Sequence, residues 1–360
     1  MSDAHRSRLE ALRARLDPGL EALLVSNPSN IFYLSGFTGS AGLLLVGRAG
    51  ATLYSDFRYR LQAAEQAPAV EFVEVERGLV KGAGEKLAQS GLARVGYDQA
   101  HLTCQSRETL SEAASGVAWL EAAGVVEELR LVKSGEEIER MRRAAELADR
   151  ALAHLVTVMK PGAKERDLAL EAEFLMRRAG AEAAAFKVIV GSGPHGALPH
   201  AEVTERELQA GDLVVLDLGA RLEGYCSDVT RTFAVGEACR QARDIYALVY
   251  RAQRAALAAV RAGAVGREVD AVARTLIAEA GYGEAFGHGL GHGVGIEVHE
   301  GPRLAREVDA VLAAGNVVTV EPGIYLEGFG GVRLEDMVAV TEDGSVTLTS
   351  YPMAADVPIL

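Results

Sequence analysis

Two aspartates near the middle of the chain, Asp217 and Asp228, are spaced for a shared chemical site. Asp217 follows the apolar run 213–216, which predicts a buried strand. Asp228 sits in a second β-type run that continues through residues 229–233, with a Glu-Gly turn between the two runs. A hairpin closing near residues 222 and 223 would place the aspartates opposite each other on one face. Because adjacent buried carboxylates repel, they need a shared cation or a shared proton, and we favour a metal site.

An internal repeat doubles this arrangement in the second half of the chain. Residues 210–217 match residues 314–321 at an offset of 104, and residues 162–180 match residues 263–281 at an offset of 101. Each half should therefore contain two helices followed by a strand hairpin, with a carboxylate at the end of its first strand. A pseudo-two-fold axis between the halves would bring Glu321 toward Asp217.

The second copy supplies the remaining candidate ligands. Glu335 occupies its returning strand as Asp228 does in the first copy, and the glycine-rich segment 287–295 carries His292. Four carboxylates with one imidazole offer too many oxygens for a structural zinc site and too much negative charge for one divalent ion. Two divalent metal ions are therefore expected, and the donors favour Mn²⁺, with Co²⁺ or Zn²⁺ as alternatives. Such a pair would hold a bridging hydroxide and polarise a carbonyl, as in hydrolases.

A competing motif lies upstream of the first hairpin. Residues 191–196 satisfy the pattern G-x-G-x-x-G after an apolar run. A dinucleotide-binding loop should then open a helix. Pro194 and Pro199 follow instead, and no helical periodicity begins there. We therefore disfavour nucleotide binding.

Composition limits the class of protein. With 360 residues, two domains are expected, and 49% hydrophobic residues are enough for sizeable cores. The net charge of −13 argues against a nucleic-acid partner and against an anionic membrane. No apolar leader or run of bilayer length is evident. Three cysteines without metal or redox spacing suit a reducing compartment, so we expect a cytoplasmic protein.

The first third of the chain reads as a small α/β unit without a constellation that carries chemistry. Its expected strands and helices lie at residues 21–25, 42–46, 51–54, 70–75 and 94–97, and at residues 57–66 and 102–114. A charged segment beginning at residue 127 then crosses to a long helix, for which Ser134 is the expected N-cap. Substrate shaping or oligomer contacts are the roles left for this part of the chain.

The strings around the candidate ligands resemble those of one known group of enzymes, the pita-bread metallopeptidases. They read Leu-Asp-Leu-Gly, Ser-Asp-Val-Thr-Arg-Thr, Gly-His-Gly-Val-Gly, Val-Glu-Pro-Gly and Arg-Leu-Glu-Asp. Within that group the chain resembles the Xaa-Pro peptidases, which comprise aminopeptidase P and the Xaa-Pro dipeptidases (prolidases). The resemblance implies an α+β architecture: a pita-bread catalytic domain with an internal pseudo-two-fold repeat over residues 128–360, preceded by a smaller α/β domain over residues 1–127. It also implies a homodimer.

The resemblance also assigns roles to the metal ligands. Asp217 would chelate one ion, Asp228 and Glu335 would bridge both ions, and His292 and Glu321 would hold the other. Glu321 resembles the family's proton shuttle as well. The expected mechanism is attack of a metal-bridging hydroxide on the carbonyl before proline, followed by protonation of the proline nitrogen.

Further residues match positions around the family's substrate. His200 and His299 would contact the substrate and stabilise the oxyanion, and His288 matches another active-site histidine. Arg333 would hold a bridging aspartate behind the ligands. Phe186 would line the pocket.

The expected substrates are proline-containing peptides, but their length stays open at this point. Arg303 resembles an arginine proposed to bind the free carboxylate of a dipeptide in prolidases. Leu222 is apolar where some dipeptidases carry a tyrosine, which lowers that reading. We therefore favour an Xaa-Pro aminopeptidase, with an Xaa-Pro dipeptidase as the alternative. A non-catalytic pita-bread binding protein is less favoured, because all five ligands are retained.

Overall fold

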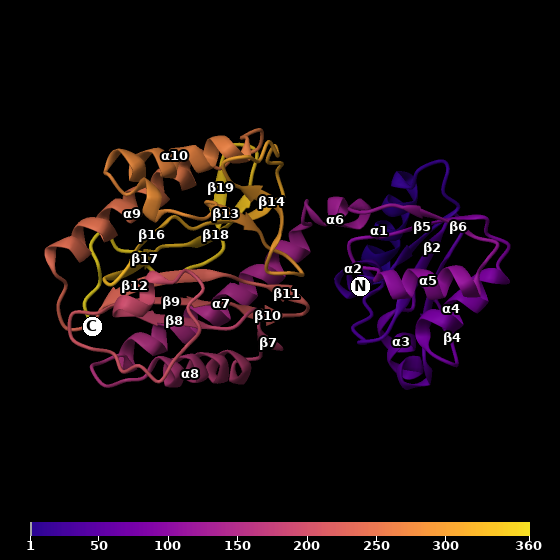
Figure 1. Cartoon of the computed structure of the whole chain (residues 1–360), viewed down its shortest axis with the longest axis horizontal. Coiled ribbons are helices and arrows are strands. Elements are labelled where there is room, and N and C mark those ends of the chain that lie inside the picture. The colour runs from indigo at the N-terminus through magenta and orange to yellow at the C-terminus, as the bar shows by residue number, and fades with distance from the viewer. Residues whose placement is uncertain (1) are drawn as a thin grey trace. The chain divides into compact units, whose positions relative to one another are not determined.

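The computed structural model describes residues 2–360, and the chain divides into two compact units (Figure 1). The first unit ends at Arg130 and the second spans Leu131–Leu360. The predicted boundary after residue 127 falls inside helix α6 (Val125–Arg130). The end of α6 stays with the first unit, because the Tyr33 hydroxyl donates to the Leu129 carbonyl at 3.2 Å and Arg130 donates to Asn30 Oδ1 at 2.7 Å.

The N-terminal unit is built on a six-stranded mixed sheet in the order β4-β3-β2-β1-β5-β6. The strands are β1 (Ala22–Val25), β2 (Leu43–Gly47), β3 (Ala51–Ser55), β4 (Glu71–Glu74), β5 (Arg94–Tyr97) and β6 (Ala118–Glu121). The helices are α1 (Ser2–Arg15), α2 (Pro28–Ser35), α3 (Arg60–Gln66), α4 (Leu79–Ala88) and α5 (Cys104–Ala113), with a 3-10 turn η1 (Phe57–Tyr59) before α3. The α/β character and the five strands predicted for this region are confirmed.

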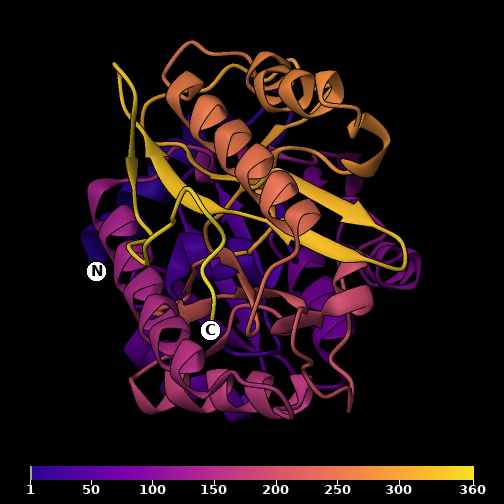
Figure 2. The same cartoon turned by 90° about the vertical axis from the view of Figure 1, so that its left-hand side faces the viewer.

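Two helix pairs frame the second unit. They are α7 (Gly135–Val158) with α8 (Glu165–Arg178), and α9 (Arg240–Ala259) with α10 (Gly266–Glu279). The bounds of α8 and α10 differ by the 101 residues of the predicted repeat. Ser134 caps α7 in a capping box with Glu137, which explains where that helix begins. Figures 1 and 2 show the two pairs on opposite sides, with the strands between them.

The strands between the helix pairs form several short antiparallel sheets. The first half contributes β7 (Ala183–Ala184), β8 (Ile189–Ser192), β9 (Leu213–Leu218), β10 (Ala220–Leu222), β11 (Tyr225–Cys226) and β12 (Val229–Ala234). The second half contributes β13 (Gly291–Gly293), β14 (Glu300–Leu304), β15 (Val317–Val320), β16 (Gly323–Leu326), β17 (Gly330–Arg333), β18 (Asp336–Val340) and β19 (Ser345–Thr347). The central orders are β12-β9-β8 and β14-β13-β15-β18-β19. Two helices followed by a hairpin in each half is the organisation that the repeat predicts.

Apolar packing explains why the strands are held between the helices. In the first half, Leu147 of α7 and Met176 of α8 belong to one buried cluster with Val214 of β9. In the second half, Ile245 of α9 and Val318 of β15 belong to another. Full burial of each such side chain contributes about 1.5–3 kcal/mol relative to exposure. These two cores keep the ends of β9 and β15 in place, and those ends carry the carboxylates.

The register of the first hairpin differs from the prediction by two residues. Asp217 pairs with Thr230, not with Asp228, because β10 and β11 join through the two-residue turn Glu223-Gly224. Both turn residues have positive φ, 49° and 80°, as a type I′ turn requires. Moving the turn centre by one residue shifts the pairing by two, and an even shift preserves the face. Asp228 therefore stays on the same face as Asp217, as a diagonal neighbour.

The motif that resembled a dinucleotide loop does not open an α-helix. Residues 191–196 run from β8 into the 3-10 turn η2 (Gly193–Ala197). Among residues 2–360, no helix is both long enough and apolar enough to cross a bilayer.

Candidate metal centre

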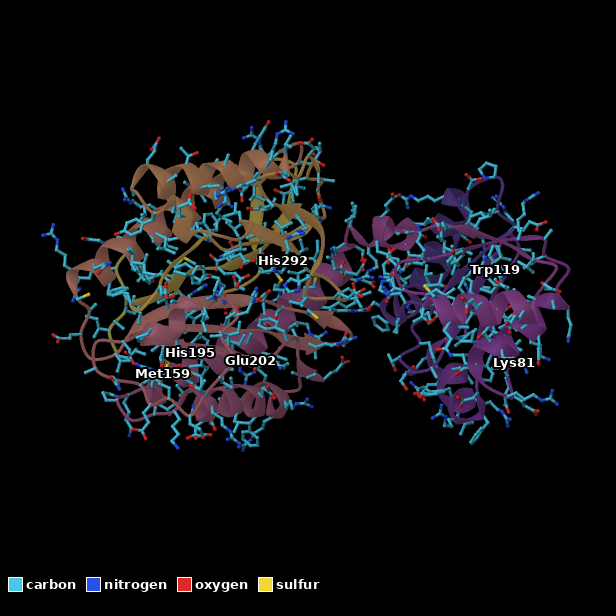
Figure 3. The ribbon with its side chains drawn as sticks, in the orientation of Figure 1. Lys81, Trp119, Met159, His195, Glu202 and His292 are labelled. Atoms are coloured by element: carbon cyan, nitrogen blue, oxygen red, sulfur yellow. The ribbon has the colours of Figure 1, made fainter. Side chains whose placement is uncertain are left out.

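The predicted ligands of the two halves meet between the helix pairs. Asp228 and Glu335 each lie one residue before a returning strand, β12 and β18, and His292 lies in β13. Asp228, His292 and Glu335 offer one ligand atom each, and these three atoms lie within 4.8 Å of one another. His292 Nε2 is also 3.3 Å from Glu321 Oε1. Figure 3 shows His292 among the strands between the two helix pairs.

Asp217 joins the cluster through a chain of hydrogen bonds. Thr230, its partner across the hairpin, donates its hydroxyl to Glu335 Oε2 at 2.6 Å. Arg333 donates from Nε to that hydroxyl at 3.2 Å and from Nη2 to Asp217 Oδ2 at 2.6 Å. All five predicted ligands are thus gathered in one buried region.

Two carboxylate oxygens and one imidazole nitrogen of the cluster are available to bind divalent cations. Asp217 Oδ1 and Glu335 Oε1 are buried and have no hydrogen-bond partner within residues 2–360. A buried carboxylate oxygen without a donor is costly unless a cation meets it. His292 Nδ1 lies 3.0 Å from the Gly293 carbonyl, which can only accept, so Nδ1 carries a proton and Nε2 is the nitrogen left to bind a metal ion. That tautomer is the one found in metal-binding histidines.

The pKa shifts of the clustered carboxyl groups also indicate a site for cations. Burial, followed by the charge of Glu335, raises the pKa of Asp228 well above its ordinary value. Burial, followed by the charge of Glu321, raises the pKa of Glu335 well above its ordinary value. Burial also disfavours the charge on Glu321, but the hydrogen bond from a protonated His292 and the charges of His292, His288 and Arg333 together outweigh this and lower the pKa of Glu321 to about 2. Without a cation, the cluster therefore holds protons that metal ions would displace.

Metal binding should consequently stabilise the protein more as the pH rises. A carboxyl whose folded-state pKa is raised stabilises the fold below its unfolded pKa, and that stability is lost as the pH climbs through the raised value. Asp228 and Glu335 are such groups, so the metal-free fold weakens above about pH 4, where unfolded carboxyls ionise. Mn²⁺ at a thousand times its Kd adds about 4 kcal/mol, or about 10 °C in Tm. Calorimetry with EDTA or with Mn²⁺ should show this gap near pH 8 and a smaller gap near pH 5. Equal gaps at both pH values would contradict the assignment.

Arg333 ties the ligands to the surrounding loops. Its Nη1 donates to the Tyr325 hydroxyl at 2.7 Å and to the Pro199 carbonyl at 3.0 Å, while Nη2 holds Asp217. The sequence predicted that Arg333 would hold a bridging aspartate, for which Asp228 was the candidate. Its contact is with Asp217 instead, because the register places Thr230 and Asp217 beside the guanidinium.

His288 belongs to the same network. Its Nδ1 lies 2.8 Å from the Gly289 carbonyl, so Nδ1 carries the proton and Nε2 accepts from the Tyr325 hydroxyl at 3.1 Å. Burial lowers the pKa of His288 and favours the neutral ring that this tautomer requires. The chain Asp217–Arg333–Tyr325–His288 thus uses both ring nitrogens of His288. It leaves this histidine to support the other members of the chain.

Two other predicted residues lie near the cluster at exposed positions. The His299 ring packs edge-on against the His292 ring, with centroids 4.4 Å apart. Partial burial, followed by the neighbouring His292, lowers the pKa of His299, so its ring is neutral at pH 7. His200 is exposed and follows Pro199, whose carbonyl is bound by Arg333.

The last two predicted residues border the same region. Phe186 is half-buried between β7 and β8 and lies against Gly219, where a Cβ would collide with its ring. The Phe186 ring therefore packs against the backbone two residues after Asp217. Arg303 in β14 is exposed, and its side chain forms no hydrogen bond or ion pair within the described residues. Its charge contributes to the lowered pKa of His299.

Comparisons with known proteins agree with this geometry. Residues 139–342 match metallopeptidase family M24, and residues 8–132 match the creatinase/prolidase N-terminal domain. The chain belongs to metallopeptidase family M24. The resemblance to pita-bread peptidases and the predicted α+β fold are thereby confirmed.

Individual relatives cover almost the whole chain. The Xaa-Pro dipeptidase of Pyrococcus horikoshii is 38% identical over 92% of this chain and 93% of its own length. The structure of the Xaa-Pro dipeptidase from Bacillus anthracis has a TM-score of 0.95 at 41% identity and covers 99% of this chain and 100% of that one. The X-Pro aminopeptidase from Thermotoga maritima has a TM-score of 0.88 at 35% identity, covering 95% and 98%.

Several residues of this M24 site were missed by reasoning from the sequence. Thr230 could have been found, because it lies two residues after Asp228 and so shares its face by strand period. Thr319 donates to Glu321 Oε1 at 3.0 Å and accepts from the His292 amide at 3.1 Å. Tyr325 lies two residues after the Val-Glu-Pro-Gly string that contains Glu321, but nothing local marks it as the partner of Arg333.

Two further groups of polar residues lie outside the M24 ligand set. His195 Nδ1 lies 2.9 Å from the fully buried Glu165 carboxylate. In the N-terminal unit, Asp98, His101 and Glu127 bring ligand atoms within 4.8 Å of one another. Asn27 uses Oδ1 as a helix cap, so its Nδ2 donates to His101 Nε2 at 2.8 Å. A cation at that nitrogen would have to displace the amide.

Proposed function

We propose that the protein is a divalent-metal-dependent peptidase that hydrolyses the bond before proline, with free Xaa-Pro dipeptides as its preferred substrates. The observation that carries the catalytic part is the gathering of five metal-ligand residues with two unpartnered buried carboxylate oxygens. The whole-length similarity to Xaa-Pro dipeptidases supports the substrate class. Mn²⁺ is our proposal for the resident ion, because oxygen donors outnumber the single imidazole.

A bond to proline suits this site for a chemical reason. The amide nitrogen of proline carries no N–H, so a peptidase cannot recognise that bond through a donated hydrogen bond. Histidine donors beside the ligands can read the carbonyl oxygen instead. His299 lies against His292, and its lowered pKa keeps the ring neutral at pH 7, where it still has one N–H to donate. His200 would donate a second hydrogen bond from the segment 193–203.

The mechanism divides the work among residues of both halves. When bound, divalent ions would polarise the scissile carbonyl and lower the pKa of the attacking water. Asp217, Asp228, His292, Glu321 and Glu335 would hold them. Glu321, in its ionised form, would accept the proton of the attacking water. The same carboxyl would pass that proton to the proline nitrogen, while His200 and His299 stabilise the oxyanion.

Arg303 favours dipeptides over longer peptides. It is exposed on β14, four residues after His299, and has no partner within the described residues, so its guanidinium is available to a free carboxylate. The sequence favoured the aminopeptidase, and the relatives shift the balance slightly toward the dipeptidase. Xaa-Pro aminopeptidase activity stays the second candidate, supported by the likeness to the Thermotoga maritima enzyme and by apolar Leu222.

Replacing Arg303 by Ala tests the substrate length. We expect kcat/KM for Ala-Pro to fall about tenfold to a hundredfold, mostly through KM, because one charge-assisted hydrogen bond is worth about 1.5–3 kcal/mol. Cleavage of Ala-Pro-Ala, whose carboxylate lies one residue further away, should change little. The matched control is Arg306→Ala, an exposed arginine three residues along. Wild-type cleavage of the tripeptide alone would favour the aminopeptidase and make Arg303 incidental.

Two expectations stay predictions. The resemblance implies a homodimer, which sedimentation analysis of the metal-loaded protein would check. The cytoplasmic location expected from the cysteine pattern would be checked by cell fractionation.

A further inference from the structure

One buried carboxylate outside the metal cluster organises a loop that enters the site. Glu165 is the first residue of α8, and its side chain is fully buried. It accepts from the Ser192 amide at 2.9 Å and hydroxyl at 2.7 Å, and from the Thr204 amide at 3.2 Å and hydroxyl at 2.6 Å. His195 Nδ1 adds a contact at 2.9 Å. Figure 3 shows His195 on the side of the second unit where α8 lies.

These contacts close both ends of one segment. Ser192 and Thr204 flank residues 193–203, and His200 lies within that segment. Burial opposes ionisation of Glu165, but the bonds from Thr204 and Ser192 outweigh it and lower the pKa of its carboxyl. An ionised carboxylate can accept all of these hydrogen bonds at once, whereas an amide would turn its NH₂ group toward some of the donors.

The middle of the segment is fixed from the opposite side. The Pro199 carbonyl, one residue before His200, accepts from Arg333, which also binds Asp217. Gly196 packs so closely on Gly331 of β17 that a Cβ on Gly331 would collide with the Gly196 carbonyl. The loop is therefore held at its two ends by Glu165 and at its centre by a residue that contacts the ligands.

From this juxtaposition we propose that Glu165 is a positioning residue for His200. The Glu165 carboxylate binds both ends of the loop 192–204 and thereby fixes the position of the His200 imidazole relative to Asp217. The proposal rests on the proposed role of His200 in binding the substrate. It predicts that Glu165 acts through His200 and not through the ligands, which it does not contact.

A double-mutant cycle tests this with Mn²⁺-loaded enzyme and Ala-Pro as substrate. We expect Glu165→Gln to lower kcat/KM about tenfold to a hundredfold, the effect typical of residues that orient a functional group, with bound Mn²⁺ unchanged by metal analysis. In a His200→Ala background the same substitution should change kcat/KM less than about twofold, because coupled residues are not additive. The control is Glu205→Gln, an exposed carboxylate that lies directly after the loop and pairs with Lys164 and Arg166.

The possible outcomes distinguish a failure of the proposed role of His200 from a failure of the proposed role of Glu165. If His200→Ala alone leaves kcat/KM unchanged, the proposed role of His200 fails, and this inference with it. If His200→Ala lowers kcat/KM but Glu165→Gln does not, or lowers it equally in both backgrounds, only the inference is overturned. Thr204→Val, which keeps the Thr204 amide bond and removes the hydroxyl bond, repeats the cycle should Glu165→Gln fail to fold. It should show the same coupling with a smaller effect.

Discussion

Asp228→Asn is expected to remove bound metal and peptidase activity together. Asp228 is in the cluster with His292 and Glu335, and the resemblance assigns it as a bridge between the two ions. An amide has nearly the same shape but no charge, so it cannot offset the charge of two cations. Metal ions supply several kcal/mol of transition-state stabilisation, and each 1.36 kcal/mol is tenfold in rate. We therefore expect kcat/KM for Ala-Pro to fall by at least about 10³-fold.

Metal analysis after dialysis, beside the kinetic assay, measures this result. The matched control is Glu223→Gln, an exposed carboxylate in the turn of the same hairpin that pairs with Arg140 and Arg143. It should retain both metal and activity. An Asp228→Asn protein that stays active without metal would disprove the mechanism. The variant should fold, because burial and repulsion from Glu335 already penalise the charge of Asp228 in the metal-free protein.

Arg333→Lys should give the second largest loss. The guanidinium reaches Asp217, Thr230, Tyr325 and Pro199 at once, and an ammonium on a flexible stem cannot hold all four. Breaking a buried ion pair of this kind costs about 3–5 kcal/mol, although Lys keeps part of the charge interaction. Loss of a partner that orients a metal ligand lowers metal affinity about tenfold to a hundredfold. We expect weaker Mn²⁺ binding together with a kcat loss of about a hundredfold at saturating Mn²⁺.

Titration with Mn²⁺ followed by kinetics at saturation separates those two effects. Arg221→Lys is the control, because this arginine lies in β10 of the first hairpin, is partly exposed and lies 3.8 Å from Glu182. A result in which Arg333→Lys recovers full kcat at high Mn²⁺ would reduce Arg333 to a determinant of metal affinity. Unchanged affinity and unchanged kcat would remove it from the site.

The sequence by itself determined the repeated helices and strands of the second unit and the set of candidate ligands. The apolar run before Asp217 and the repeat that matches Glu321 to it predicted two equivalent strands, because a short continuous run rich in Val and Leu is typical of a strand buried on both faces. The offset of 101 residues predicted α10 from α8 to the residue. These features are local, since period, caps and turn residues act over a few positions. The ligand set followed because so many carboxylates in apolar surroundings require a cation.

The tertiary structure alone decided which partners those residues have. Asp217 meets Arg333 from 116 positions away, and Thr230 meets Glu335 from 105 positions away. Glu165 acquires its five hydrogen bonds only when the loop 192–204 folds back onto α8. The turn at Glu223-Gly224 moved the register by two residues and set Thr230 opposite Asp217. Such contacts depend on how the two cores place the strand ends, and no short stretch of sequence contains that information.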